Sequence, residues 1–411
     1  MQPYSPERRT ALVLCGTGAE GAYHAGVLRA IEEAGVKIDV VAGHGVGAGA
    51  AALAAIGGSA RLWEADGLWR GRSARAFYRW KWPLALGGWF ALLLGATMVA
   101  VAAAEAVGVT AGRRWLSLVP VAMLLLLALT LAAGGWLTDR GGRGRRRTRG
   151  RPWWRLIGAP LDAGVIRRAF AGAMSPRYSE VLSESLGQPG FREVMIVATD
   201  LDARTDIVAA LLREPYHDGF TAPRQGLERG AEIIDLAGTG RDHAVGIIAA
   251  ALTPPLVCDP QPVTFGTDTY WRGETHRLCD RPGAAGRLLE ELAGAGVTQA
   301  IVVSGVGRLQ KPHRLSAPRL ELRHRLGEFL AAAEAAALRD ALEMARLRFD
   351  GVYVIAPTHN PVGAFDVAGA YDEASDRIQT LVEVMARGYE DASHQFIEPV
   401  VGASGERLAH D

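Results

Sequence analysis

A glycine stands where the surrounding sequence would place a nucleophile. Residues 43–47 read Gly-His-Gly-Val-Gly, after the mainly apolar segment 36–42 and before the alanine-rich segment 48–56. A strand, a tight glycine corner and a helix form a nucleophile elbow, whose middle residue presents a hydroxyl for attack on a carbonyl carbon. The middle residue here is Gly45, which has no side chain. The sequence therefore predicts an elbow without its reacting atom, made of Gly43, His44, Gly45, Val46 and Gly47.

A second glycine cluster precedes the elbow. Its members are Gly16, Thr17, Gly18, Glu20 and Gly21. The cluster follows an apolar strand at 11–15 and opens a helix at 21–34, so its backbone N–H groups could bind an anion or an oxyanion. The same G-x-G-x-x-G spacing occurs in dinucleotide sites, which also need an acidic residue at the end of the second strand. Asp39 precedes the apolar end of that strand, and a nucleotide-binding membrane protein is kept as a third hypothesis.

The two clusters together resemble the patatin-like phospholipase family. Three ordered segments carry the resemblance: ALVLCGTGAEGAYHAGVL, VVAGHGVGAGA and AVGIIAAALTPPLVCDPQPVTFGTDTYWRGETHRLCDRP. The resemblance implies an oxyanion loop, an elbow serine and a downstream aspartate that accepts the serine proton. The chain departs from that pattern at three places, with Glu20 in place of a basic residue, Gly45 in place of the serine and Arg272 in place of the aspartate. The resemblance thus implies the family fold with a degenerate catalytic dyad.

These departures predict an impaired enzyme. Glycine has no atom for attack, and by analogy with a serine protease the loss of a nucleophile lowers turnover on the order of a millionfold. Arginine cannot accept a proton at any working pH. Cys15 lies beside the glycine loop and is the alternative nucleophile, with His24 and His44 close to it in sequence. Asp268 and Asp280 are alternative bases.

Two apolar segments separate the elbow from the rest of the chain. Residues 83–104 and 115–137 are each long enough to cross a bilayer as a helix. Arginine and lysine gather outside the pair, at 70–81 and 140–151, with two arginines between the segments. The positive-inside rule therefore predicts a transmembrane hairpin whose two ends face the cytoplasm. The basic run Arg140 to Arg151 is expected to bind anionic lipid head groups rather than nucleic acid.

Outside the hairpin, the apolar pattern predicts strands that alternate with helices. Strands are expected at 193–199, 206–212, 262–265, 300–304 and 351–355, and helices at 243–252, 284–293, 320–347 and 371–389. This alternation favours an α/β fold with a mostly parallel sheet covered on both faces. The expected domains are the first part of a patatin-like α/β domain at 1–82, the transmembrane hairpin at 83–137, a basic juxtamembrane segment at 138–160 and the remainder of the α/β domain at 161–411.

The composition restricts the partners. With 45 lysines and arginines against 44 acidic residues, no global basic field favours nucleic acid. Three scattered cysteines provide neither a disulfide framework nor a zinc site, so neither a metal nor a cofactor is expected. The leading hypothesis is a lipid- or acyl-binding pseudohydrolase on the cytoplasmic side of a bacterial-type inner membrane. The alternative is a lipid acyl hydrolase that uses Cys15, and the protein partners are left open.

Overall fold

The chain divides into two compact units. One comprises residues 1–77, 163–255 and 260–411, and the other comprises residues 78–162 and 256–259. The structure is a computed structural model, and it describes residues 4–108, 113–141, 156–174, 177–222, 229–268, 271–306, 321–358, 360–372 and 375–402. The glycine clusters belong to the first unit and the two hydrophobic segments to the second.

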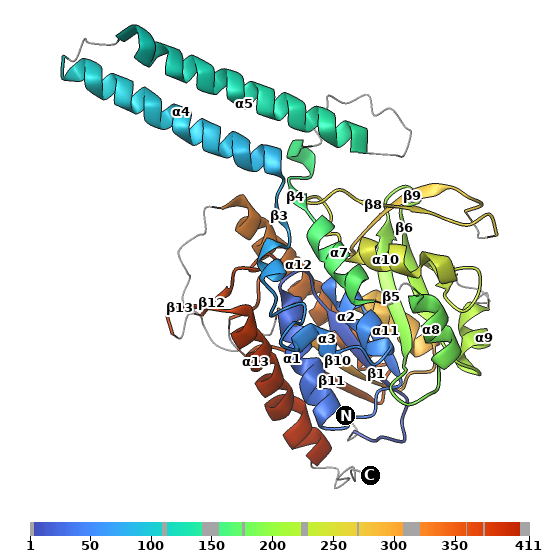
Figure 1. Cartoon of the computed structure of the whole chain (residues 1–411). Helices are drawn as coiled ribbons and strands as arrows, with labels where there is room; N and C mark the ends of the chain where they lie inside the picture. The colour runs from blue at the N-terminus through green and yellow to red at the C-terminus, as the bar shows by residue number, and fades with distance from the viewer. Residues whose placement is uncertain are drawn as a thin grey trace. The chain divides into compact units, whose positions relative to one another are not determined.

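A nine-stranded sheet forms the centre of the first unit (Figure 1). Its strands are β1 (Thr10–Cys15), β2 (Val40–Gly43), β5 (Glu193–Asp200), β6 (Thr205–Leu211), β7 (Ala231–Asp235), β8 (Gln261–Thr264), β9 (Thr275–Cys279), β10 (Gln299–Ser304) and β11 (Gly351–Ile355). In the order β11-β10-β1-β2-β5 all neighbours are parallel, whereas β6 is antiparallel to β5 and parallel to β7. The β8–β9 hairpin joins the end of β5 through β9. The predicted mostly parallel α/β sheet is confirmed.

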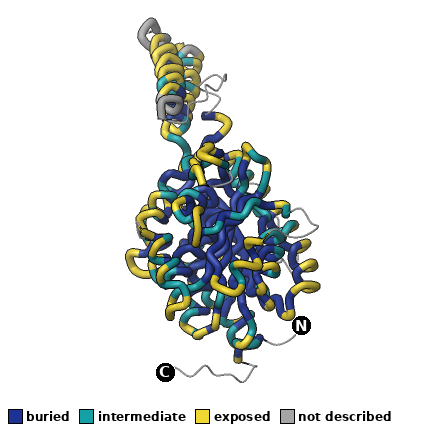
Figure 2. Tube along the Cα trace, turned by 90° about the vertical axis from the view of Figure 1, so that its right-hand side faces the viewer, coloured by how far each residue is buried: buried dark blue, intermediate teal, exposed yellow. Residues whose placement is uncertain are grey.

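Helices cover both faces of this sheet. They are α1 (Glu20–Glu33), α2 (Val46–Ala55), α3 (Ala60–Trp63), α7 (Gly164–Ala173), α8 (Tyr178–Ser185), α9 (Tyr216–Thr221), α10 (Ala244–Ala251), α11 (Ala285–Gly294), α12 (Leu322–Ala345) and α13 (Leu381–Ala392), with 3₁₀ turns at Arg72–Ala76 and Arg241–His243 and π-helical turns at Ser393–Val401. Successive side chains of β1 point to opposite faces. Val13 and Cys15 belong to the core that includes α11 and α12, whereas Leu14 contacts Gly47 of α2. Both faces are therefore buried, as Figure 2 shows.

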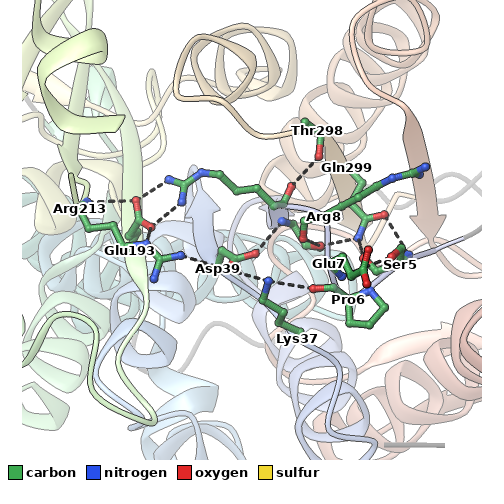
Figure 3. A network of polar contacts seen from close by, with 12 residues as sticks. Ser5, Pro6, Glu7, Arg8, Lys37, Asp39, Glu193, Arg213, Thr298 and Gln299 are labelled. Atoms are coloured by element: carbon green, nitrogen blue, oxygen red, sulfur yellow. Dashed lines mark hydrogen bonds and ion pairs between the residues drawn. The ribbon is translucent and has the colours of Figure 1, made fainter. Parts of the chain in front are cut away.

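A polar network joins the strands at their amino ends. We call it the amino-end network, and its members are Arg9, Asp39, Glu193, Arg213 and Gln299. The Arg9 guanidinium donates two hydrogen bonds to the Glu193 carboxylate, at 2.8 and 2.6 Å. Asp39 accepts a hydrogen bond from the Thr10 N–H and forms ion pairs with Lys37 and Arg213, as Figure 3 shows for most of these groups. No buried polar side-chain atom of this network lacks a hydrogen bond within the described residues.

The second unit contains the two hydrophobic helices. They are α4 (Trp82–Ala106) and α5 (Arg113–Gly141), and they lie side by side (Figure 1). Two segments, Trp82–Ala104 and Leu118–Trp136, are long and apolar enough to cross a bilayer. The same unit pairs β3 (Arg79–Trp80) with β4 (Leu161–Asp162) in an antiparallel bridge. From residue 142 onward, the basic run that begins at Arg140 lies outside the described residues.

The predicted helix at 371–389 is wrong in its first half. Strands β12 (Ala370–Asp372) and β13 (Arg377–Gln379) form an antiparallel hairpin there, and α13 begins after Thr380. The Thr380 hydroxyl accepts a hydrogen bond from the Glu383 N–H, while the Glu383 carboxylate accepts one from the Thr380 N–H. This capping box fixes the start of the helix and excludes the preceding residues from it.

Candidate active site

The turn between β2 and α2 has the backbone of a nucleophile elbow and no nucleophile. Gly45 has φ 58° and ψ −133°, a conformation that residues with a side chain rarely adopt. Gly43 and Gly47 allow a close approach, because a Cβ at Gly43 would meet the backbone of Gly47 and a Cβ at Gly47 would meet the Leu14 carbonyl group. The chain therefore makes the sharp strand-to-helix turn that would present a side chain at position 45.

A carboxylate faces the position of the missing side chain. A Cβ at Gly45 would lie 3.1 Å from Oδ2 of Asp280, the residue that follows β9. Arg272 lies in the exposed connection between β8 and β9, with φ 44°, and Asp268 is exposed in the same connection. Asp280, one of the two alternative bases, is therefore an acidic side chain beside the elbow, whereas Arg272 and Asp268 lie exposed in the connection between β8 and β9.

The glycine loop lies against the elbow. The Gly16 carbonyl accepts a hydrogen bond from the Val46 N–H at 2.9 Å, and a Cβ at Gly45 would overlap the same carbonyl oxygen. In a nucleophile elbow, the N–H of the residue after the nucleophile is one of the oxyanion donors. That donor is used inside the protein here, and the loop backbone takes the space of the missing side chain.

Glu20 takes two further backbone donors. Its carboxyl group accepts hydrogen bonds from the Thr17 N–H at 3.3 Å and from the Gly305 N–H at 3.2 Å. Glu20 is fully buried, and burial together with the nearby Glu334 carboxylate raises the pKa of Glu20 well above its ordinary value. A side chain of the loop itself therefore occupies N–H groups with which such a loop could bind an oxyanion.

His44 connects the acidic groups to a thiol. Its Nδ1 atom lies 3.5 Å from Asp280 Oδ1 and 3.8 Å from Glu334 Oε1, and its ring interacts with the Cys15 thiol. Burial by itself lowers the pKa of His44, but these partners outweigh burial and raise that pKa well above its ordinary value. Burial also raises the pKa of Glu334 to about 7. We call this group the carboxyl-end cluster, and its members are Cys15, Thr17, Glu20, His44, Asp280 and Glu334.

The cluster contains one hydroxyl and one thiol. Thr17 Oγ1 donates a hydrogen bond to Asp280 Oδ2 at 2.9 Å. The Cys15 thiol is buried, and burial raises its pKa although His44 lowers it in part. His24 Nε2 lies 3.0 Å from the Cys15 carbonyl oxygen, and burial lowers the pKa of His24 to about 4, so its ring is neutral at pH 7. His24 therefore contacts the backbone of Cys15, and His44 is the imidazole beside the thiol.

Three polar atoms inside the cluster make no hydrogen bond in the part of the chain that the structure describes. They are His44 Nδ1, Asp280 Oδ1 and Glu334 Oε1. They face one another, with His44 Nδ1 3.5 Å from Asp280 Oδ1 and 3.8 Å from Glu334 Oε1, which are ion-pair distances longer than those of a good hydrogen bond. Strongly shifted pKa values and unsatisfied groups that gather at one place are typical of functional sites. The carboxyl ends of β1, β2 and β9 and the middle of α12 therefore form the candidate site.

Sequence reasoning missed Glu334, and it considered Asp39 as the acidic residue of a dinucleotide site. Glu334 lies between Leu330 and Leu338 at helical spacing, so an acidic residue on a buried helix face was the available signal. Asp39, the residue considered for a ribose, belongs to the amino-end network at the opposite ends of the strands from the glycine loop. Its position does not favour a dinucleotide site.

Comparison with known proteins agrees with this geometry. Residues 12–213 match the family model of the patatin-like phospholipases, a range that includes the glycine loop and the elbow. Among solved structures, VipD from Legionella pneumophila is similar at 12% sequence identity and a TM-score of 0.34, over 95% of this chain and 67% of VipD. No curated protein sequence matches the chain. The glycine loop, the elbow and the family match lead to one conclusion, that residues 12–213 belong to a domain of the patatin-like phospholipase family.

Proposed function

We propose that this chain is a membrane-attached patatin-like protein that binds lipid and does not hydrolyse it. The observation that carries the proposal is the pair of Gly45 and Asp280. The carboxylate stands where it could accept a proton from an elbow hydroxyl, and position 45 has no hydroxyl. The base of the family reaction is therefore present, and the attacking atom is missing.

The state of the oxyanion donors supports the same proposal. An acyl hydrolase stabilises its tetrahedral intermediate with N–H groups that are free to turn toward the developing charge. The N–H groups of Val46, Thr17 and Gly305 are all bound by groups of the protein, two of them by Glu20. A substrate carbonyl would have to displace these bonds before any reaction.

The hydrophobic helices support membrane attachment. A pair of apolar helices in a soluble core would be mostly buried, but 6% of Trp82–Ala104 and 17% of Leu118–Trp136 is buried in the described structure (Figure 2). Two exposed apolar helices of this length match the thickness of a bilayer. The basic residues outside the pair favour a hairpin with both ends on the cytoplasmic side.

Labelling and turnover test the catalytic part of the proposal. We expect the purified full chain, in neutral detergent, to show no labelling by a fluorophosphonate and no turnover of phospholipid or short acyl esters above that of a detergent blank. Asp280→Asn is the matched variant, because it removes the base and keeps the shape of the side chain. Turnover in the wild type that Asp280→Asn abolishes would contradict the proposal.

Alkaline extraction tests the membrane part. We expect the full chain to stay in the membrane pellet after carbonate treatment, because a spanning hairpin is held by the burial of apolar surface rather than by charge. Protease added to right-side-out vesicles should leave the first unit intact. Release of the chain into the supernatant would contradict attachment by the hairpin.

One observation favours a second candidate, a hydrolase with a cysteine nucleophile. His44 contacts both Cys15 and Asp280, which is the order of contacts in a cysteine–histidine–aspartate triad. The raised pKa of the Cys15 thiol argues against it, because the thiolate is the attacking species. If this candidate is correct, Cys15→Ala abolishes an ester hydrolase activity that the control Cys279→Ala, also a buried free cysteine, retains.

A further inference from the structure

A cavity lined by arginines lies in the first unit, outside the candidate active site. Its volume is about 350 Å³, and it lies between the segment 69–75 and the start of α13. Arg70, Arg72 and Arg75 line it on one side. Val367, Ala368 and the residues Thr380–Val382 line the other side. No acidic residue is among the described residues that line it.

Buried apolar side chains anchor the segment that contains these arginines. Trp69, Ala74 and Phe77 are almost completely buried, and the rings of Trp69 and Phe77 meet edge to face at 5.6 Å. Arg70, Arg72 and Arg75 are exposed. The buried side chains fix the backbone of the segment. The three guanidinium groups lie between these anchors in the sequence and line the cavity.

The three guanidinium groups are available to a ligand. None of them forms an ion pair or a side-chain hydrogen bond with another described residue, whereas Arg29 and Arg377 are each paired with a glutamate. Trp69 also lines the cavity, and its buried indole N–H has no hydrogen-bond partner in the described ranges. Arginine forks suit the oxygens of a phosphate group, and a cavity of this volume accommodates a phosphate with a small alcohol attached.

The arginines that line the cavity lie shortly before the first hydrophobic helix in the sequence. Arg75 precedes Trp82, the first residue of α4, by seven residues. An extended chain of that length spans at most about 25 Å. Basic residues that flank a spanning helix on its cytoplasmic side attract anionic lipids, and here three such residues line a cavity as well.

We infer that this cavity binds the phosphate head group of an anionic phospholipid, with Arg70, Arg72 and Arg75 as its ligands. The inference rests on the proposed attachment to a membrane, and it assigns these arginines a role beyond setting the orientation of the hairpin. It also separates lipid recognition from the carboxyl-end cluster, so a chain without a nucleophile still has a site for a lipid.

The test measures lipid bound to the full chain. The protein is purified in a neutral maltoside detergent and titrated with phosphatidylglycerol or phosphatidylcholine, and the bound lipid is read by native mass spectrometry. We expect phosphatidylglycerol to bind in preference. The triple variant Arg70→Gln, Arg72→Gln, Arg75→Gln should bind it on the order of a hundredfold more weakly, since each basic residue near a lipid surface contributes roughly a fivefold factor.

Two further variants make the result specific. The control Arg339→Gln, Arg346→Gln, Arg348→Gln removes the same charge from exposed positions around the end of α12 and should change the affinity less than about threefold. Ala368→Glu adds a carboxylate to the exposed lining of the cavity without removing an arginine. It should weaken the binding of phosphatidylglycerol, as the first triple variant does.

Three outcomes would overturn the inference. They are equal losses in the two triple variants, no preference of the wild type for phosphatidylglycerol, and equal occupancy by inorganic phosphate, which would make the ligand a free anion. Carbonate extraction measures membrane attachment separately. If carbonate releases the chain but the chain still selects phosphatidylglycerol, the membrane hairpin is contradicted and the head-group site is supported. If the chain stays in the pellet but does not select phosphatidylglycerol, the hairpin is supported and the head-group site is contradicted.

Discussion

The two ends of the central sheet both carry buried charged groups, but they differ in how those groups are satisfied. At the amino ends, Arg9 and Glu193 form a two-fold hydrogen-bonded pair, and the members around them are bonded as well. At the carboxyl ends, His44, Asp280 and Glu334 each keep a buried atom without a hydrogen bond within the described ranges. The same strands therefore end in a completed network on one side and an incomplete cluster on the other.

The difference separates stability from function. A complete network of charged groups fixes the register of the strands, whereas an incomplete one costs free energy and persists where something else requires it. The elbow has Gly45 at its middle position, and Asp280, Glu20 and Glu334 are all buried in the carboxyl-end cluster. Several buried acidic groups at one place favour a functional role for this cluster.

The largest expected effect comes from breaking the completed end. Glu193→Ala should lower the free energy of unfolding by about 3–5 kcal/mol, because it leaves the Arg9 guanidinium buried without its carboxylate. Chemical denaturation of the full chain in detergent measures this change. Lys37→Ala is the control, since its ion pair with Asp39 is half exposed and should contribute less than about 1 kcal/mol. Similar losses in both variants would remove the contrast between the ends.

The next effect concerns the pH dependence of the incomplete end. Burial raises the pKa of Glu334 from 4.5 to about 7, so the folded state holds this proton more tightly than the unfolded state. Its contribution to stability is therefore present below pH 4.5 and is lost as the pH rises to about 7, by up to about 3 kcal/mol. The raised pKa of His44 acts in the same direction above pH 6.5.

Glu334→Gln should therefore flatten the fall in unfolding free energy between pH 5 and pH 8. Denaturation curves at several pH values measure the slope for the wild type and the variant. The control Glu328→Gln, at an exposed position of the same helix, should keep the wild-type slope. An unchanged slope in Glu334→Gln would mean that this carboxyl group titrates normally in the folded state.

The fold could be predicted from the sequence to a large extent, because its signals are local. Apolar runs with β-branched residues located β1, β5, β10 and β11, and the glycines at 43, 45 and 47 located the elbow. The hairpin β12–β13 was missed because its strands have three residues each, too few for a period to appear. The capping pair Thr380 and Glu383 was the signal for the true start of α13.

The candidate site was predicted less completely, because part of it depends on contacts distant in sequence. The elbow and the loop follow from glycine spacing, but Arg272 was matched to the base by its distance from Tyr270 and Trp271 along the chain. Strand β9 was not predicted from the sequence. It pairs with the end of β5, and Asp280 follows directly after it. Glu334 arrives from α12, more than fifty residues further on, and no local pattern links it to His44.

A smaller effect is expected at the elbow itself. Gly45→Ala should destabilise the chain by about 2 kcal/mol, since the new Cβ takes a strained backbone conformation and overlaps the Gly16 carbonyl oxygen. For the same reason Gly45→Ser should not acquire esterase activity, although Asp280 is in place. Gly172→Ala in α7, where a Cβ meets open space, should be neutral or stabilising by up to about 1 kcal/mol. Robust turnover in Gly45→Ser would show that the loop can withdraw from the elbow.

The smallest effect tests whether Thr17 completes part of the cluster. Thr17→Val keeps the shape of the side chain and removes its hydrogen bond to Asp280 Oδ2, so it should lower the free energy of unfolding by about 1 kcal/mol. The control Thr264→Val breaks an exposed hydrogen bond to Thr275 and should change stability by less than about 0.5 kcal/mol. If Thr17→Val is neutral or stabilising, Asp280 gains nothing from this donor, and the incomplete end of the sheet has even fewer stabilising contacts than its geometry indicates.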